Sequence, residues 1–466
     1  MSATRLEHDL LGELEIPATA YWGIHTARAA ENFRISGVPI GHYRSLIRAI
    51  ALVKLAAAEA NAQVGVLETD IKDSIVAAAS EVADGKFDRE FIVDAIQGGA
   101  GTSTNMNANE IIANRALEIA GHQKGDYDRI HPLNHVNMSQ STNDVYPTAL
   151  KVAIIIELRN LLSALEHLKG AFAAKAEEFD LIIKMGRTQL QDAVPMTLGQ
   201  EFSTFARMIG EDQQRLRDAI PLLCEINLGG TAIGTQLNAP AGYAQAACHL
   251  LGELAAVNLV VAEDMVEATQ DAGVFVTISG VLKRVAVKLS KTSNDLRLLS
   301  SGPRAGLGEI NLPPMQAGSS IMPGKVNPVI PEVVNQVAFA VVGNDMTVTM
   351  AVEAGQLQLN AFEPIICRAL MMSITQLTAA ARTLADRCVT GITANADHLR
   401  RSVENSIGLV TALSPQLGYE NATEVAKRAS ESGKSVREVV VSMGLMTDAE
   451  LDAALGDVQK LVHPLD

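Results

Sequence analysis

A short polar loop is the part of the chain whose residue types point most directly to chemistry. The run from Gly318 to Pro328 reads Gly-Ser-Ser-Ile-Met-Pro-Gly-Lys-Val-Asn-Pro, which combines two hydroxyls, a lysine and an amide. Glycine lets the backbone bend, and the prolines interrupt any helix there. Lys325 supplies a charge that favours both an ionised serine and a bound carboxylate. The run therefore predicts a loop that closes over a small anionic substrate and places a deprotonated oxygen beside a carbon acid; a plain surface turn is the alternative.

The composition bounds what the chain can bind. With 466 residues, 48% of them hydrophobic, it can bury a large core and divide into more than one unit. Its formal net charge of -15 disfavours nucleic acid and anionic membrane surfaces as partners. The same acidic balance repels an anionic substrate, so a site for such a substrate has to be locally positive.

Other residue patterns exclude further classes of function. The four cysteines form no Cys-x-x-Cys pair, which is typical of reduced thiols in a cytosolic protein. The N-terminus has no apolar signal core, and no uncharged apolar run is long enough to span a membrane. The glycine-rich runs at 99–104 and 229–235 lack the dinucleotide and phosphate-loop patterns. His131 and His135 lie four apart in a loop-like passage, so we expect no metal site there.

Long amphipathic helices dominate the middle of the chain. Apolar residues recur at three- and four-residue spacings over 143–395, as one face of a helix requires. The pattern predicts helices at 150–162, 196–220, 276–299, 331–357 and 364–389. Five such helices suggest a bundle, and Val333–Val342 is apolar on most sides, which predicts burial against other subunits. In the small helical tail, Thr447 and Glu450 have the spacing of a capping box.

Four polar patches interrupt the apolar helices. They are Gly101-Thr102-Ser103, Ser141-Thr142-Asn143-Asp144, Gly186-Arg187-Thr188-Gln189 and the loop at 318–328. Hydroxyl and amide groups can hold carboxylates and ammonium without adding charge. Each patch alone is also consistent with a helix cap, because Ser, Thr, Asn and Asp are capping residues.

The loop and the patches together resemble the site-forming regions of the fumarase/aspartase superfamily, in order and at similar separations. The loop matches the superfamily pattern Gly-Ser-x-x-Met-x-x-Lys-x-Asn at every fixed position, and the resemblance covers essentially the whole chain. It implies a mainly α, three-domain fold whose central bundle of long helices assembles into a tetrameric helical core. The residue pattern along the chain places these domains: a mixed, mostly helical N-terminal domain at 1–142, a five-helix bundle at 143–395 and a small helical domain at 396–466.

Within the superfamily the chain is most similar to the aspartases, or aspartate ammonia-lyases. The supporting segments are Gln140–Asp144, Lys184–Met196, Glu353–Asn360 and Gly433–Val440. Fumarases usually carry histidine where this chain has Gln189, and dehydration needs an acid that histidine can supply. The ammonium of aspartate departs without a further proton, and a glutamine carbonyl can hold it. Gln189 therefore favours deamination over dehydration.

The resemblance implies an anti β-elimination that converts L-aspartate reversibly to fumarate and ammonia. Ser319, as alkoxide, would remove the proton from C3. The implied binding groups are Thr102, Ser141, Thr142 and Ser320 for the resulting aci-carboxylate, Lys325 and Asn327 for the other carboxylate, and Asn143, Thr188 and Gln189 for the ammonium. Glu332 is either a solvated first-turn helix carboxylate or, as in related fumarases, a group that orients residue 189.

The resemblance further implies a homotetramer whose active sites each combine residues from three chains, and the cysteine pattern predicts a cytoplasmic location. The resemblance implies no organic cofactor and leaves open a response to divalent metal, which some aspartases show. Fumarate hydratase is the alternative enzyme. A non-catalytic structural protein on the same scaffold is a further alternative, and the intact Ser319, Lys325 and Asn327 argue against it.

Overall fold

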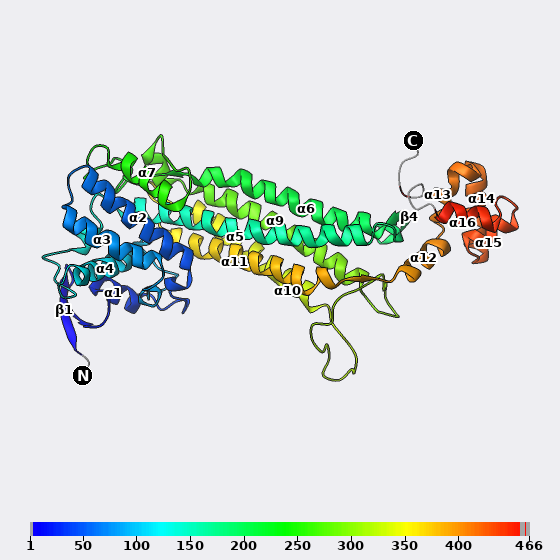
Figure 1. Cartoon of the computed structure of the whole chain (residues 1–466), viewed down its shortest axis with the longest axis horizontal. Helices are drawn as coiled ribbons and strands as arrows, with labels where there is room; N and C mark the ends of the chain where they lie inside the picture. Colours follow the sequence, from blue (N-terminus) through cyan, green and yellow to red (C-terminus); the bar gives the residue numbers. More distant parts are fainter. Residues whose placement is uncertain (1–2, 457–461, 463–466) are drawn as a thin grey trace. The chain divides into compact units, whose positions relative to one another are not determined.

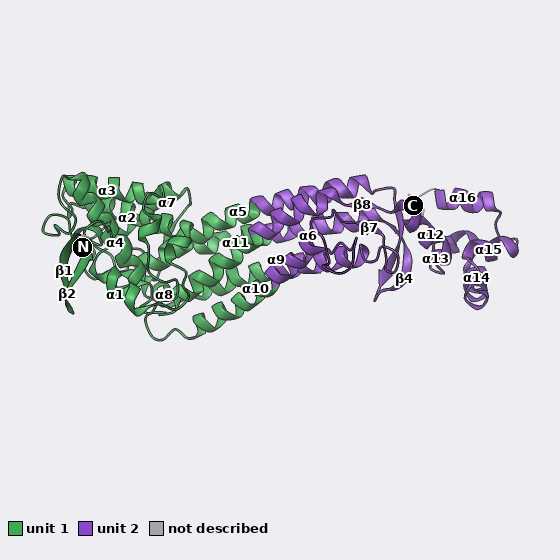
Figure 2. Cartoon of the chain, turned by 90° about the horizontal axis from the view of Figure 1, so that it is seen from below, with its two compact units in different colours: residues 1–162, 214–284, 339–377 green, residues 163–213, 285–338, 378–466 purple. Residues whose placement is uncertain are grey.

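The computed structural model describes residues 3–456 and residue 462, and it is mainly α-helical, as predicted. The packing of its backbone divides the chain into two compact units (Figure 2). Unit 1 comprises residues 1–162, 214–284 and 339–377, and unit 2 comprises residues 163–213, 285–338 and 378–466. Helices begin at Thr142 and Ala396, next to two of the expected domain limits, and the three-domain division stays a prediction.

Five long helices confirm the five predicted from the sequence. They are α5 (Thr142–Glu178), α6 (Leu198–Ala219), α9 (Gly273–Leu299), α10 (Val329–Glu353) and α11 (Glu363–Arg387). Within each unit their segments lie side by side (Figure 1). The stretch Glu363–Gly391 is long and apolar enough to cross a bilayer, but 67% of its most apolar window is buried inside the protein. That burial is the pattern of a core helix.

Unit 1 is built around helix α2 (Arg44–Gln63). Helices α3 (Thr69–Ala83), α4 (Thr102–Ile119) and α7 (Tyr243–Ala255) pack against it, and the many buried alanines of α2 allow this close approach. The unit also contains the hairpin β1 (Thr4–Asp9) and β2 (Gly12–Pro17), α1 (Ile24–Asn32), a π-helical turn (Pro132–Val136), the paired β5 (Glu225–Ile226) and β6 (Val260–Val261), and α8 (Met265–Gln270). Three short 3-10 helices lie at Ile40–His42, Asp88–Glu90 and Ile220–Leu223.

A buried carboxylate fixes the start of α1 against α4. Glu110 of α4 accepts hydrogen bonds from the backbone N–H groups of Gly23 and His25, each at 2.8 Å. It also accepts from the backbone and the hydroxyl of Thr26. Because a negative charge at a helix N-terminus is favourable, Glu110 both caps α1 and holds it beside α4.

Unit 2 contains the antiparallel hairpin β3 (Ile183–Thr188) and β4 (Gln191–Thr197), and β7 (Ile310–Asn311) pairs with β8 (Thr393–Ala394). Five tail helices follow: α12 (Ala396–Asn405), α13 (Leu409–Leu417), α14 (Tyr419–Ser432), α15 (Val436–Ser442) and α16 (Asp448–Gly456). Their apolar faces form one core with Ile183 and Met185 of β3. The capping box is confirmed, since Thr447 N–H donates to Glu450 at 2.8 Å and Glu450 N–H donates to the Thr447 hydroxyl at 3.2 Å.

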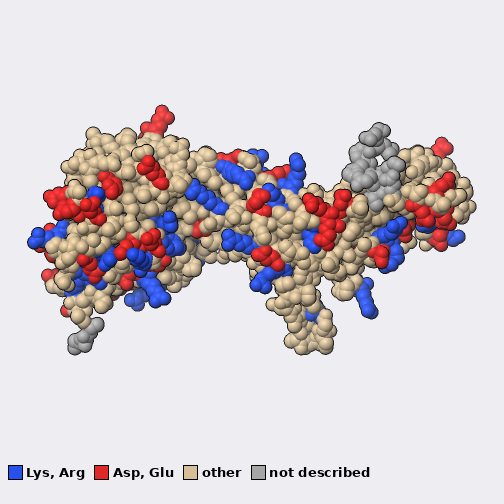
Figure 3. Space-filling view, viewed as in Figure 1, with Lys and Arg blue, Asp and Glu red and all other residues tan. Residues whose placement is uncertain are grey.

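Charged side chains of both signs are interspersed over the face seen in Figure 3. That face carries no broad area of one sign. A locally positive site therefore has to be sought in particular residues rather than in the general surface field.

Candidate active site

The N-termini of helices α4 and α5 meet in unit 1. Thr102 is the first residue of α4 and Thr142 the first of α5. Asn105, one turn into α4, donates a hydrogen bond from its side-chain nitrogen to the Thr142 hydroxyl oxygen at 3.1 Å. Gly101 permits this approach, because a Cβ there would lie 2.3 Å from the ring of Tyr146. Two helix N-termini that converge favour an anion.

The predicted residues Ser141, Thr142 and Asn143 lie together at the start of α5. The Ser141 hydroxyl accepts a hydrogen bond from the Asn143 N–H at 3.3 Å. The Asn143 side-chain nitrogen donates to the Ala232 carbonyl at 2.7 Å, so within one chain one of its hydrogens already has a partner. The hydroxyls of Ser141 and Thr142 are therefore the groups of this patch that are best placed to donate to a ligand.

Buried Asp144 holds a second loop against this patch. One of its oxygens accepts from the Ser141 N–H at 3.0 Å, and the other accepts from the N–H groups of Gly229 and Thr231 at 3.1 and 2.9 Å. Burial raises the pKa of Asp144 to about 7, against the effect of these N–H groups and of Lys54. The loop at 229–231 is thus part of the frame that positions Ser141 and Asn143.

A buried lysine lies beneath the hydroxyls. Lys54 of α2 is fully buried, and its Nζ donates to the side-chain oxygens of Asn137 and Gln140, both at 2.9 Å. Burial lowers the pKa of Lys54 to about 7, and the neighbouring Asp144 opposes that shift. The two helix N-termini, with Lys54 when it is protonated, make this region more positive than the acidic chain as a whole.

Thr102 also lines a cavity of about 650 Å³ in unit 1. His25 and Arg28 of α1 line the same cavity, and Arg28 pairs with Asp9 at 2.8 Å. Sequence reasoning identified neither of these residues, nor Lys54, Asn105 and Asn137. The sequence did offer one signal of these supporting residues, the asparagines at 105, 107 and 109 inside a helix. Buried amides need specific hydrogen-bond partners, so such a run indicates a polar network.

Thr188 and Gln189 lie at the tip of the β3–β4 hairpin in unit 2. Thr188 pairs with Gln191, so Gln189 and Leu190 form a two-residue turn, with φ of 55° and 64°. This left-handed conformation is typical of Gly and Asn in such turns and costs other residues conformational energy. Strain of this kind is often found at functional sites, where the surrounding structure maintains it.

An ion network maintains the hairpin. Glu309, which is 1% exposed, lies 2.7 Å from Lys184 Nζ and also pairs with Arg187. Lys184 is itself buried and lies 2.6 Å from Glu201 of α6. The network fixes the strand that ends in Thr188.

We expect Glu309→Gln to lower the free energy of unfolding by about 2–3 kcal/mol, because it removes a buried partner from both Lys184 and Arg187. Urea denaturation of the purified protein measures this. Glu201→Gln is the matched control, since Lys184 then keeps Glu309 and the loss should be smaller. Equal losses from the two variants would contradict the role given to Glu309.

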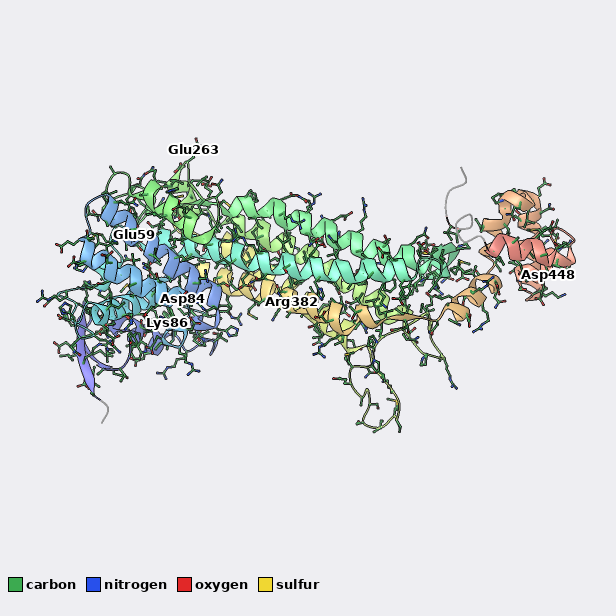
Figure 4. The ribbon with its side chains drawn as sticks, viewed as in Figure 1. Glu59, Asp84, Lys86, Glu263, Arg382 and Asp448 are labelled. Carbon is green, nitrogen blue, oxygen red and sulfur yellow. The ribbon has the colours of Figure 1, made fainter. Side chains whose placement is uncertain are left out.

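The loop at 318–328 projects from unit 2 and is closed at its base (Figure 1). Gly318 N–H donates to the Lys325 carbonyl at 2.8 Å, and the Asn327 side chain donates to the Gly318 carbonyl at 2.7 Å. A Cβ at Gly318 would lie 2.6 Å from the Lys325 carbonyl oxygen, so the base requires glycine. Ser320 and Lys325 are exposed on the loop, whose side chains stand clear of the helices (Figure 4).

Two backbone amides point at the Ser319 hydroxyl. The N–H groups of Ile321 and Met322 donate to Ser319 Oγ at 3.2 and 2.9 Å. Hydrogen bonds donated to an oxygen favour its ionised form. The loop therefore lowers the cost of ionising the Ser319 hydroxyl to the alkoxide.

The structure brings Thr102 and Ser141–Asn143 together through Asn105 in unit 1, and residues 188–189 and 319–327 belong to unit 2. Within the described part of unit 2, no hydrogen bond joins residues 188–189 to residues 319–327. Glu332 lies half-buried in the first turn of α10, and among residues 3–456 no hydrogen bond joins its side chain to Gln189. The individual roles of these residues stay predictions. Within the described residues, no cluster of three or more His, Cys, Asp or Glu side chains could hold a metal ion.

Comparison with known proteins identifies related sequences along the chain. A family profile described as "Lyase" matches residues 12–343, and one described as "Fumarase C C-terminus" matches residues 409–463. Aspartate ammonia-lyase of Pseudomonas aeruginosa is 58% identical over 452 residues, which cover 97% of this chain and 95% of that protein. Aspartate ammonia-lyase of Escherichia coli K12 is 54% identical over 461 residues, which cover 99% and 96%.

Solved structures agree with these sequences. A Brucella melitensis protein described as fumarate lyase:delta crystallin, bound to cobalt, superposes with a TM-score of 0.96 at 54% identity, covering 99% of this chain and all of that one. A class II fumarase from Schistosoma mansoni superposes with a TM-score of 0.91 at 34% identity, covering 98% and 99%. On the extent of these matches, the chain belongs to the fumarase/aspartase superfamily of lyases, and within it to the aspartate ammonia-lyase family.

Proposed function

We propose that the protein is a carbon–nitrogen lyase that reversibly deaminates L-aspartate to fumarate and ammonia. The observation that carries the proposal is identity of 54–58%, along nearly the whole chain, to proteins named aspartate ammonia-lyase. Gln189 supports it chemically, because a glutamine can hold an ammonium but cannot act as the acid that dehydration needs. The reaction needs no organic cofactor.

Ser319 is the proposed general base. The amides of Ile321 and Met322 and the charge of Lys325 lower the cost of ionising its hydroxyl, and loop closure removes water from around it. The alkoxide takes the proton from C3 of L-aspartate, and the electron pair passes to the adjacent carboxylate. Ammonia then leaves from C2, on the opposite side, which gives fumarate.

The remaining site residues bind the substrate and stabilise the intermediate. Thr102, Ser141, Thr142 and Ser320 donate to the aci-carboxylate, which carries two negative charges in the intermediate and rests against two helix N-termini. Lys325 and Asn327 hold the other carboxylate. Asn143, Thr188 and Gln189 hold the ammonium, and Glu332 orients Gln189.

One assay tests the function. Purified protein is mixed with fumarate and ammonium, and separately with fumarate alone, while the ultraviolet absorbance of fumarate is followed. We expect the absorbance to fall only when ammonium is present. A fall in absorbance without ammonium would instead identify the protein as a fumarate hydratase. No change in either mixture would support the alternative of a non-catalytic structural protein.

We also propose a cytoplasmic homotetramer with composite active sites. Helix α10 supports the assembly, because Phe339, Met346 and Met350 lie on one helical face and are 67%, 59% and 66% exposed in the single chain. An apolar stripe of this length is costly to leave in water.

Phe339→Glu should break the tetramer into smaller species, because symmetry would bring several copies of the new charge into one apolar interface. Sedimentation velocity measures the change in mass. Phe339→Leu keeps the face apolar and should remain tetrameric. A tetramer that survives the glutamate would place the interface elsewhere.

A further inference from the structure

Three amides beneath Thr142, two of them buried and one half-buried, form a hydrogen-bonded chain whose direction can be deduced. It runs from Asn137 through Asn105 to the Thr142 hydroxyl, and Asn109 joins it from the next turn of α4. Asn105 is 2% exposed and Asn109 is fully buried. The direction matters because a hydroxyl in such a chain can either donate or accept.

The polarity of Asn137 is fixed from two sides. Its side-chain nitrogen lies 3.2 Å from the backbone carbonyl of Gln140, which can only accept. Its side-chain oxygen faces Lys54 Nζ at 2.9 Å. The neighbouring Gln140 side chain is fixed in the same way, because its nitrogen donates to the carbonyls of Val136 and Met138 while its oxygen faces Lys54. Lys54 therefore donates to both amides, and Asn137 presents its oxygen to α4.

Asn105 must then turn its nitrogen toward Asn137. That nitrogen lies 3.1 Å from the Asn137 oxygen and 3.1 Å from the Thr142 hydroxyl oxygen, so its two hydrogens serve both acceptors. The flipped amide would place two oxygens against each other. In the observed orientation both hydrogens of the Asn105 nitrogen have an acceptor, and the side-chain oxygen has no protein partner in the described part of the chain.

Thr142 consequently accepts from Asn105, and its own hydrogen remains. Among residues 3–456, no protein acceptor receives that hydrogen. We propose that Asn105, oriented by Asn137 and Lys54, is a positioning residue that makes the Thr142 hydroxyl an obligate donor to a bound carboxylate. This inference deepens the proposed function and rests on it for the identity of that carboxylate as the one that becomes doubly charged.

A fixed donor differs in effect from a free hydroxyl. A hydroxyl that can rotate must be reoriented as charge develops, whereas one whose acceptor side is already occupied is ready in advance. The benefit is largest in the intermediate, where the carboxylate carries more charge than in the substrate. Loss of this orientation should therefore lower kcat more than it raises KM.

Asn105→Asp reverses the hydrogen bond between residue 105 and Thr142. A carboxylate can only accept, so the Thr142 hydroxyl then donates its hydrogen to residue 105 instead of to the ligand. We expect kcat/KM for L-aspartate to fall on the order of 100-fold, as when one preorganised donor is lost. Asn109→Asp is the matched control. Asn109 also lies buried on α4 and donates to the same Asn137 oxygen at 3.1 Å, but it makes no hydrogen bond to Thr142, so we expect a loss of less than about tenfold.

A double-mutant cycle separates this role from a structural one. In a Thr142→Val background, Asn105→Asp should cost little further activity, because the hydroxyl that it misdirects is gone. In a Ser141→Ala background the two losses should multiply. Asn105→Ala runs through the same cycle if the aspartate variant does not fold. Multiplying losses with Thr142→Val, or equal losses from the variants at 105 and 109, would overturn the proposal.

The affinity of succinate, measured by calorimetry over the same cycle, supplies a readout that does not depend on turnover. It should show a coupling of the same sign between Asn105 and Thr142, smaller than the coupling in kcat/KM because each carboxylate of succinate carries only one charge. If the wild-type protein failed to deaminate L-aspartate, the proposed function would be wrong. The coupling in succinate binding would still test whether Asn105 orients the Thr142 hydroxyl. Absence of coupling in succinate binding and in catalysis would overturn the inference even in an active aspartase.

Discussion

Ser319→Ala should remove nearly all turnover of L-aspartate, with kcat falling by about 10³–10⁴-fold, in the upper part of the range for a general base. Substrate affinity should stay within a few-fold, because the groups proposed to hold both carboxylates and the ammonium remain. The hydroxyl makes hydrogen bonds only within its own loop among the residues described, so the midpoint of thermal unfolding should not change. Steady-state kinetics at saturating substrate, with direct measurement of binding, test both parts.

Ser320→Ala is the natural control for this variant. It changes the adjacent hydroxyl on the same exposed loop, so any general disturbance of the loop is shared. As Ser320 is proposed to donate to the carboxylate and not to take a proton, its loss should be about 10–100-fold smaller. Wild-type turnover in Ser319→Ala would assign the base to another residue.

The sequence predicted those parts of the site whose residues lie close together along the chain. The loop at 318–328 and the patch at Ser141–Asn143 are contiguous, and their residue types alone indicate anion binding. The long helices were equally accessible, because each one repeats its apolar residues over several turns. Helix α5 nevertheless begins at Thr142, before the predicted start at residue 150, because the polar patch itself forms its first turn.

The supporting residues could not be predicted in this way. Lys54 and Asn137 are 83 positions apart, and neither belongs to a periodic pattern or a motif. Their pairing depends on how α2 packs beside the π-helical turn, and only the folded structure specifies that contact. A buried lysine in a helix of alanines is the kind of residue that the sequence marks as unusual without indicating its partner.

The turn at Gln189 shows a different limit of prediction from local sequence. A two-residue hairpin turn with both φ angles positive is normally predicted from Asn-Gly or Asp-Gly, and Gln189-Leu190 contains neither. The conformation is maintained by the ion network of Lys184, Arg187 and Glu309, which spans more than 120 positions in sequence. Local turn chemistry is thus overridden by a distant carboxylate, at the place where a substrate-binding residue is proposed.

Gly101→Ala should lower the free energy of unfolding by about 3–5 kcal/mol. About 1–2 kcal/mol comes from the left-handed backbone, at φ 91°, and the remainder from overpacking. The new Cβ would lie 2.3 Å from the Tyr146 ring, so the first turn of α4 has to move away from α5. Because Thr102 follows directly and Asn105 must reach Thr142, kcat should fall as well, by at least about tenfold.

Gly99→Ala separates the two causes. Gly99 has nearly the same φ, 88°, but a Cβ there would lie 3.8 Å from its nearest neighbour, in the side chain of Thr102. It shares the backbone strain without the overpacking, so it should lose only about 1–2 kcal/mol and keep most of its activity. Urea denaturation and turnover are measured for both variants. Equal effects at the two glycines would show that backbone conformation alone governs this segment, and that contact between α4 and Tyr146 does not position the site.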